Sequence, residues 1–285
     1  METHRLHEEL LRRSVEVLVV GCGGNGSVIA AGLPYLHSAM LAQGHPYGLH
    51  VTVMDGDIVS PFNCVRQPFA RSEVGINKAV VLVNRINLFW GLDWAAIPRA
   101  LTEKTLHPEY APYGDQCLRS DIVIGCVDTR AARATIAKSV SGSSLAGYYM
   151  DLGNSASGGQ FVLGEPLNCR NRRSRTRLRI IGELYPEMVD ETLDEDNEPS
   201  CSALEALERQ WPFVNSVLAQ HALALLARLF RYGEITCHGA FVDVAAARAV
   251  PFPVNPQLWR RVRRRGTKPR LPAGPERRLS IAEAP

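Results

Sequence analysis

Several features are missing from this 285-residue sequence, and each absence excludes a kind of site or setting. The seven cysteines form no CxxC pair, so the spacing of a four-cysteine zinc site is lacking and we expect no zinc site. The eight histidines form no HxxxH pair, and we expect them at surface or ordinary polar positions. No secretory signal precedes the first apolar strand, which together with the scattered cysteines predicts a reducing, cytoplasmic setting.

A long apolar run is missing as well. The most apolar helix candidate, 214–230, contains Asn215, Gln220, His221 and Arg228. It is too short and too polar to span a bilayer, so we expect no membrane association. With 46% hydrophobic and 21% charged residues, the composition is that of an ordinary globular protein with a sizeable core.

The net charge of +3 does not by itself predict binding to nucleic acid. Arginines are concentrated in two runs, at 170–179 and 260–278, and an acidic run at 187–198 lies between them. Blocks of like charge are usually solvated, so we expect the first run to be a solvated part of a loop. The second run could contact nucleic acid electrostatically, but disorder explains it more simply and no nucleic-acid partner is expected.

Strand and helix patterns alternate along the chain. Apolar runs predict strands at 15–20, 50–55, 94–100, 121–127, 148–152 and 160–163. Helical spacing predicts helices at 25–43, 76–90, 131–139 and 203–231, with a kink or break at Pro34 and another at Pro212. This alternation predicts an α/β, Rossmann-like, doubly wound fold with a mostly parallel sheet and helices on both faces.

The domain organisation is predicted from changes in composition. Residues 1–14 form a polar N-terminal segment, 15–250 a nucleotide-binding domain, and 251–285 a flexible tail rich in Pro and Arg. Within the domain, 165–200 is a long polar crossover loop without periodicity. A C-terminal helix and a hairpin through 235–244 complete the prediction.

A glycine-rich turn separates the first predicted strand from the first helix. Gly21, Gly23, Gly24 and Gly26 give a GxGxxG pattern, which lets backbone N–H groups approach a phosphate at a helix N-terminus. Asp55 ends the next strand, where it can bond ribose hydroxyls. No lysine follows Gly26, so the turn is not a P-loop. These residues alone predict a dinucleotide or mononucleotide site.

The segment after Asp55 separates these alternatives. It adds one acid, two amides, a guanidinium and an ammonium, and these are Asp57, Asn63, Gln67, Arg66 and Lys78. Such a set suits a triphosphate, with Arg66 as a bidentate clamp, Lys78 as a point charge and Asn63 as an orienting hydrogen-bonding group. A nicotinamide dehydrogenase has no use for it.

These motifs, taken in order, resemble the ThiF/MoeB/ubiquitin-activating adenylyltransferase superfamily. The resemblance covers roughly 15–165 and includes the glycine turn, Asp55 to Gln67, Gly75 to Ala79, and Cys126 to Arg133. More narrowly, the compact length and the sequence around Cys201 resemble ThiF-like proteins of bacterial PRTRC gene systems. The sequence departs from the superfamily pattern at Phe62, where serine is usual, and in lacking paired zinc cysteines.

The resemblance implies an activity and roles for the residues. ATP and Mg²⁺ would bind, and the C-terminal carboxylate of a small ubiquitin-like or sulfur-carrier protein would be activated as an acyl-adenylate. Asp55 would hold the ribose, Asn63, Arg66 and Lys78 the phosphates, and Asp128 the Mg²⁺ ion. Members of the superfamily form dimers, so we expect a homodimer.

Some activating enzymes pass the acyl group on to a cysteine, and Cys201 is the candidate here. A capping box of Ser202 and Glu205 places it at a predicted helix start, where the macrodipole favours a thiolate. Cys64 and Cys169 are weaker candidates, and an unreactive loop thiol remains the alternative for Cys201.

Two other functions are compatible with parts of the sequence. One is an NAD(P)-dependent Rossmann oxidoreductase, which the set of Asn63, Arg66, Lys78 and Asp128 disfavours. The other is a catalytically inactive nucleotide-binding scaffold, which the presence of the charged residues Arg66, Lys78 and Asp128 disfavours.

Overall fold

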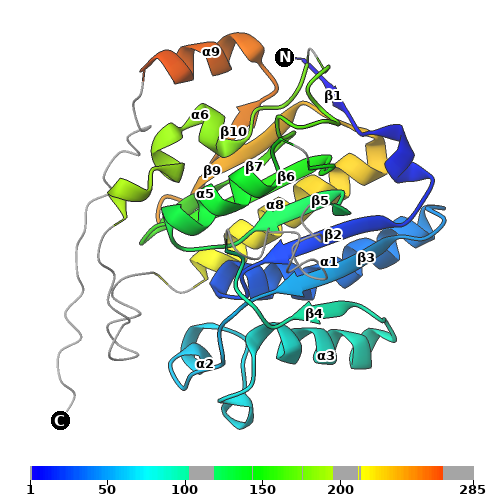
Figure 1. Cartoon of the computed structure of the whole chain (residues 1–285), viewed down its shortest axis with the longest axis vertical. Helices are drawn as coiled ribbons and strands as arrows, with labels where there is room; N and C mark the ends of the chain where they lie inside the picture. Colours follow the sequence, from blue (N-terminus) through cyan, green and yellow to red (C-terminus); the bar gives the residue numbers. More distant parts are fainter. Residues whose placement is uncertain are drawn as a thin grey trace.

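The computed structural model describes residues 2–102, 119–142, 144–174, 176–194, 211 and 213–265, with side chains for all of these except Arg66 and 262–265. An eight-stranded sheet forms its centre, in the order β10-β9-β7-β6-β5-β2-β3-β4 (Figure 1). Five of these strands are parallel, namely β2 (Val15–Val20), β3 (Leu49–Met54), β4 (Ala95–Ile97), β5 (Ile122–Gly125) and β6 (Tyr148–Asn154).

Three antiparallel strands extend the sheet beyond β6. They are β7 (Gly158–Gly164), β9 (Cys237–Asp243) and β10 (Arg248–Pro253). A separate two-stranded pair joins β1 (His4–Arg5) to β8 (Glu234–Ile235). The predicted fold class, a mostly parallel α/β sheet, is confirmed, and the hairpin lies at β9 and β10, later than the predicted 235–244.

Helices cover both faces of the sheet. On one face, α1 (Gly24–Ala42) packs against α3 (Lys78–Trp90) and α8 (Val214–Tyr232). On the other, α5 (Arg130–Ser139) packs against the 3-10 helix η5 (Pro186–Val189), which also contacts α6 (Ile181–Leu184) (Figure 1). The remaining helices are η1 (Glu8–Leu11), α2 (Asn63–Arg66), η2 (Arg71–Glu73), η6 (Glu191–Leu193) and α9 (Pro256–Arg265).

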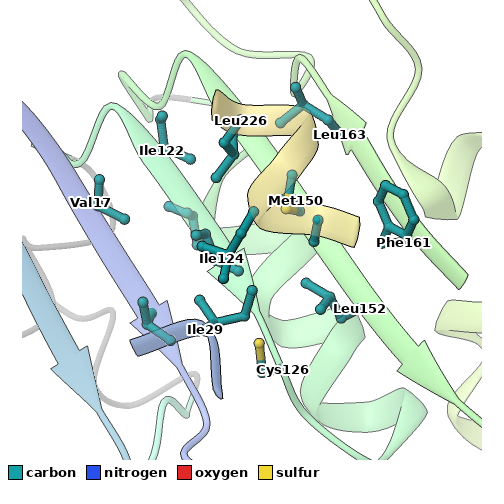
Figure 2. Packing of buried hydrophobic residues seen from close by; sticks show 14 of the residues in the cluster. Val17, Ile29, Ile122, Ile124, Cys126, Met150, Leu152, Phe161, Leu163 and Leu226 are labelled. Carbon is teal, nitrogen blue, oxygen red and sulfur yellow. The ribbon is translucent and has the colours of Figure 1, made fainter. Parts of the chain in front are cut away.

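The core lies between the sheet and the helices. All but one residue of β2 and every residue of β5 are buried, as expected for parallel strands covered on both faces. Figure 2 shows Val17 and Ile124 from these strands beside Ile29 of α1 and Leu226 of α8. Within the described residues, no helix has the length and apolar character needed to cross a membrane.

Helix α1 corrects one prediction. It continues from Gly24 to Ala42 with the buried Pro34 inside it, so of the predicted kink or break the break does not occur. A proline removes one backbone hydrogen bond from a helix. Here the packing of α1 against α8 and β2 outweighs that loss. The corresponding break predicted at Pro212 falls on a residue outside the described ones.

The described parts of the crossover and of the predicted tail, 165–194 and 251–265, contain secondary structure that the sequence does not predict. Residues 165–194 contain α6, η5 and η6, and they contribute Leu178, Ile181 and Leu184 to the core. The predicted boundary at residue 251 falls inside β10, and α9 follows as far as Arg265. The N-terminal segment also joins the core, through Leu6 and Leu10.

The first arginine run is solvated only in part: Arg172 and Arg173 are exposed, as predicted, whereas Arg177 is buried. Arg177 is 5% exposed, and its guanidinium donates to both carboxylate oxygens of Glu183 and to the Glu165 carbonyl. Arg170 bonds Glu9 and Asp121, which connects the crossover to the N-terminal segment. Pairing with a carboxylate allows an arginine to be buried, and the sequence does not reveal where the partner lies.

Two histidines, predicted at surface or ordinary polar positions, do not lie at the surface: His4 and His238 are 6% and 0% exposed. His4 Nε2 lies 2.9 Å from the Tyr148 hydroxyl. His238, on β9, donates from Nδ1 to the Leu163 carbonyl at 2.7 Å. Burial lowers the pKa of His238 from 6.5 to about 4, although the bond to Leu163 acts in the opposite direction.

We predict that His238 makes the protein sensitive to acid. As pH falls below 6.5, the unfolded chain takes up a proton at this position and the folded chain does not. The free energy of unfolding should therefore decrease by up to about 1.4 kcal/mol per pH unit until the pH approaches the folded-state pKa. Urea unfolding at pH 7 and pH 5 measures this difference.

The variant His238→Gln keeps a donor for Leu163 and removes the titrating ring, so its difference between pH 7 and pH 5 should be smaller. His221→Gln is the matched control, because His221 lies exposed on α8. An unchanged pH dependence in His238→Gln would show that other groups account for the acid sensitivity.

Candidate functional site

A cavity of about 400 Å³ lies at the carboxyl ends of β2, β3 and β5. This is the position where open α/β sheets bind ligands, and the volume is within the usual range of roughly 300–1,000 Å³ for small-molecule sites. Its lining includes most of the predicted site residues, namely Gly21, Gly23, Asp55, Asp57, Asn63, Gln67, Lys78 and Asp128. A larger groove of about 660 Å³ runs along α1 and α8, and none of the predicted site residues lines it.

The glycine turn has two functions in the structure. Gly21 has a φ of 91°, and a Cβ there would lie 2.6 Å from the Cys126 carbonyl oxygen. A Cβ at Gly26 would lie 1.8 Å from the Gly21 oxygen, and one at Gly24 would lie 2.0 Å from Nδ2 of Asn215. Gly21 and Gly26 are therefore required for packing, because backbone atoms occupy the space of a side chain there, whereas at Gly24 the obstacle is the Asn215 side chain.

Gly23 is different from the other three. It is the N-cap of α1 and lines the cavity, and a Cβ built on it meets nothing within 4 Å. A side chain there would occupy the cavity without displacing protein atoms. The glycine therefore leaves space for a ligand close to the backbone at the N-terminus of α1.

Asp55 connects the glycine turn to the loop that follows β3. Its Oδ2 accepts a hydrogen bond from the Cys22 N–H, and its Oδ1 accepts one from the Asp57 N–H at 2.7 Å. Burial raises the pKa of Asp55, while the two backbone bonds oppose that rise. The carboxylate is 9% exposed and lines the cavity.

Lys78 brings a buried positive charge to the site. It is the first residue of α3 and is 6% exposed. Its Nζ lies 2.9 Å from Oδ2 of Asp57, a side chain that is 72% exposed. This ion pair places an ammonium and a carboxylate in the same wall of the cavity.

The short helix α2 carries the predicted amides. Asn63 begins α2, and its Oδ1 accepts from the Ser60 N–H at 2.8 Å. Gln67 follows α2, and its Oε1 is buried with no hydrogen-bond partner among the described residues. That oxygen is available to a donor group in the cavity. Arg66 ends α2, and its side chain lies outside the described part of the chain.

Asp128 reaches the cavity from the opposite side. It follows β5 and is exposed in the wall of the cavity, immediately before α5. Thr129 caps α5 by accepting from the Ala132 N–H at 3.2 Å. The N–H groups of Arg130 and Ala131 donate to the Asp194 carboxylate at 2.8 and 2.9 Å, so the crossover is attached beside Asp128.

The cysteines differ in their surroundings. Cys201 lies outside the described residues. Cys22 and Cys126 are buried, and burial raises the pKa of both thiols, which keeps them unreactive. Cys169 is exposed, but its backbone N–H donates to Gly142, beyond the C-terminal end of α5. The cavity lies at the other end of that helix, so Cys169 is remote from it.

Four further residues line the cavity without having been predicted as site residues. Ala100 and Leu101, which follow β4, and Thr129 and Ala132, which begin α5, also line the cavity. Ala100, Leu101 and Ala132 are apolar and belong to no motif that indicates ligand binding, so the sequence does not identify them. Thr129 could have been recognised, because threonine is a preferred residue immediately before a helix.

Comparison with known proteins identifies the family. The ThiF family profile matches residues 4–249, so the chain belongs to the ThiF family. Comparison with curated protein sequences gave no match.

Solved structures resemble the chain to different degrees. PaaA aligns with 87% of this chain and 66% of its own, at 14% identity and a TM-score of 0.53, which indicates a shared fold. E. coli tRNA N6-threonylcarbamoyladenosine dehydratase, TcdA, in complex with ATP, aligns with 44% of this chain and 46% of its own, at 25% identity and a TM-score of 0.35. The chain thus spans about two thirds of PaaA and less than half of TcdA.

We predict that Gly23 and Gly26 respond differently to alanine. Gly23→Ala should fold with a loss of less than about 1 kcal/mol, since alanine is only a poorer N-cap. It should weaken ATP binding by at least about tenfold, because its methyl group enters the cavity. Gly26→Ala, by contrast, should destabilise the fold by about 1–3 kcal/mol or more through overpacking.

Calorimetry with Mg·ATP and with NAD, alongside urea unfolding, measures both effects. Wild-type ATP affinity in a folded Gly23→Ala protein would contradict the assignment of this glycine to the ligand. Tight NAD binding without ATP binding would contradict the triphosphate interpretation of the cavity.

Proposed function

We propose that this protein is an ATP-dependent adenylyltransferase that activates the C-terminal carboxylate of a small ubiquitin-like or sulfur-carrier protein. One observation carries the proposal: Lys78 and Asp128 line the same cavity from opposite sides, above the glycine turn. A buried cation and an exposed carboxylate across one cavity suit a nucleotide phosphate chain with its metal ion. Membership of the ThiF family supports the same chemistry.

The lining residues fit ATP and Mg²⁺ by their chemistry. Gly23 leaves room for a phosphate, and the unpartnered Gln67 Oε1 offers an acceptor to a hydroxyl or amine. Asp128 and Asp57 supply hard oxygen ligands of the kind that Mg²⁺ prefers, and we assign Asp128 as the metal ligand. When bound, the ion would neutralise phosphate charge and favour departure of pyrophosphate.

In the proposed reaction the protein binds and orients the two substrates. Asp55 holds the ribose, the N-terminal N–H groups of α1 face the phosphates, and Asn63, Arg66 and Lys78 bond phosphate oxygens. An oxygen of the substrate carboxylate attacks the α-phosphorus. The bond from that phosphorus to the bridging oxygen breaks, and pyrophosphate leaves. A carboxylate is ionised near pH 7, so no general base is needed.

The alternatives are less well supported. A nicotinamide oxidoreductase would need a hydride-transfer acid or base, and the cavity instead presents three carboxylates and a lysine. An inactive scaffold would have no need for Lys78 and Asp128 on opposite sides of one cavity. Within the described residues, the Lys78 ammonium pairs with the exposed Asp57, so a phosphate could exchange with that partner.

We further propose that the enzyme works as a homodimer in the cytoplasm. The apolar groove along α1 and α8 supports a protein contact, since large exposed apolar patches mark interaction sites. Exposed Tyr35 and Phe89, whose rings both contact Trp90, extend the apolar surface beside α1.

We predict that Asp128→Ala abolishes adenylate formation without unfolding the protein. Losing the metal ligand should slow ATP–pyrophosphate exchange by at least about a hundredfold, while the exposed position leaves stability nearly unchanged. In this exchange assay, small proteins encoded by neighbouring genes are tested as the carboxylate substrate. Asp93→Ala removes an exposed carboxylate outside the cavity and is the matched control. Near wild-type exchange in Asp128→Ala would refute the assigned role.

A second step, transfer of the acyl group to Cys201, is also part of the proposal. The thiolate sulfur would attack the acyl carbonyl carbon, the bond to the AMP oxygen would break, and AMP would leave. Two described contacts support it: Asp194 is attached to the start of α5, and the Trp211 N–H donates to the Ala156 carbonyl at 2.7 Å, between β6 and β7. Asp194 and Trp211, the described residues on either side of Cys201 in the sequence, are therefore both held near the edge of the sheet that carries the cavity.

The two steps can be separated by mutation. Cys201→Ala should retain ATP–pyrophosphate exchange but lose any reductant-sensitive adduct with the small-protein substrate on a non-reducing gel. Cys169→Ala is the matched control, because Cys169 lies at the far end of α5. Persistence of the adduct in Cys201→Ala would move the step to another thiol, and absence of an adduct in the wild type would end the reaction at the adenylate.

A further inference from the structure

Asn77 is the residue before Lys78, and the proposed reaction has so far given it no role. We propose that Asn77 is a positioning residue that fixes the phosphate-facing lysine relative to the Asp55–Asp57 loop. The expected effect of Asn77 on ATP binding rests on the proposed function, whereas its contacts with the loop do not.

The Asn77 side chain uses both of its amide hydrogens on the loop that follows β3. Its Nδ2 donates to the Asp55 carbonyl at 2.9 Å and to the Asp57 carbonyl at 3.0 Å. Its Oδ1 accepts from the Val80 N–H at 3.2 Å and so caps α3. One side chain thus bonds the loop that carries Asp55 and Asp57 and the helix that carries Lys78.

Backbone bonds around Asn77 join the same two segments. The Lys78 N–H donates to the Asp57 carbonyl at 3.0 Å, and the Val59 N–H donates to the Ile76 carbonyl at 2.8 Å. The Asp57 carbonyl therefore accepts from both Asn77 and Lys78. Any shift of that carbonyl changes the position of the Asp57 carboxylate, to which the Lys78 ammonium is bound.

The bonds of the Asn77 side chain require more than a residue that can cap α3. Serine, threonine and aspartate cap helices about as well as asparagine, but none of them has a side-chain N–H₂ group. Asparagine alone combines the capping oxygen with two donors at this side-chain length. The two donors are directed at the carbonyls of the proposed ribose ligand and of the lysine's partner.

The variant Asn77→Ser tests this role. Serine retains a neutral cap for α3 and removes both amide donors. Asn87→Ser is the matched control: Asn87 lies on the same helix and bonds both the carbonyl and the N–H of Trp94, at 2.8 and 3.0 Å, away from the cavity. Asn77→Ala removes cap and donors together and should be the least stable of the three.

Hydrogen exchange measures the positioning directly. In Asn77→Ser the amides of Val59 and Lys78 should exchange faster, while that of Val81, bonded to the backbone carbonyl of residue 77, should stay protected. The thermal midpoint should remain near that of the wild type. The dissociation constant and KM for Mg·ATP should rise roughly tenfold, as expected for a lost hydrogen-bonded alignment, and Asn87→Ser should leave both unchanged.

The outcomes separate this inference from the proposed function. Wild-type protection of Val59 and Lys78 in Asn77→Ser would overturn the positioning role, whatever the ATP result. Faster exchange with unchanged ATP affinity would show that the contact is structural only, and would also overturn it. If wild-type protein bound no ATP, the proposed function would fail, and hydrogen exchange alone would decide whether Asn77 holds the loop.

Discussion

The turn between β2 and α1 has no room for side chains at Gly21 and Gly26, and the candidate site depends on this close packing. Gly21 lies against the Cys126 backbone at the end of β5, and Gly26 lies against Gly21 itself. The contact brings the N-terminus of α1 over the edge of the sheet, between the ends of β3 and β5. The loop with Asp55 and the loop with Asp128 can then face one cavity.

A buried ion pair keeps the Asp128 side of the cavity in place. Arg133 of α5 donates from Nε to Asp151 of β6 at 2.8 Å, and the Tyr149 hydroxyl donates to the same carboxylate oxygen at 2.9 Å. Burial raises the pKa of Asp151, and the charge of Arg133 opposes that rise. Removing one member of a buried pair typically costs about 3–5 kcal/mol, because the other charge is left unpaired.

Arg133 also connects that pair to two loops. Its guanidinium donates to the Val127 carbonyl at 3.4 Å and to the Met188 carbonyl at 3.3 Å. Val127 directly precedes Asp128, and Met188 belongs to the crossover. The same buried charge therefore sets the distance between the candidate metal ligand and the segment that leads towards Cys201.

The sequence predicts the parts of the site that follow from strand order. Asp55 and Asp128 each come shortly after a buried parallel strand, and the carboxyl ends of such strands meet at one edge. Contacts between distant segments are not predictable in this way. The burial of Arg177 depends on Glu183 and the Glu165 carbonyl, and the role of Asn77 depends on two carbonyls of another loop. The spacing and periodicity of the sequence mark none of these partners.

Charge determines what the cavity can accept. Three carboxylates, Asp55, Asp57 and Asp128, line it, whereas Lys78 is the single cation among its described lining residues. Among these described residues the carboxylates outnumber the cation, so they would repel a triphosphate that enters without a metal ion. Under the proposed function, Asp128 would hold a divalent cation that reverses this balance, and exchange of Asp57 for a phosphate oxygen at Lys78 would keep the buried ammonium paired. Under the proposed function, nucleotide and metal therefore bind as one unit, and the excess of carboxylates selects against nucleotide without its metal.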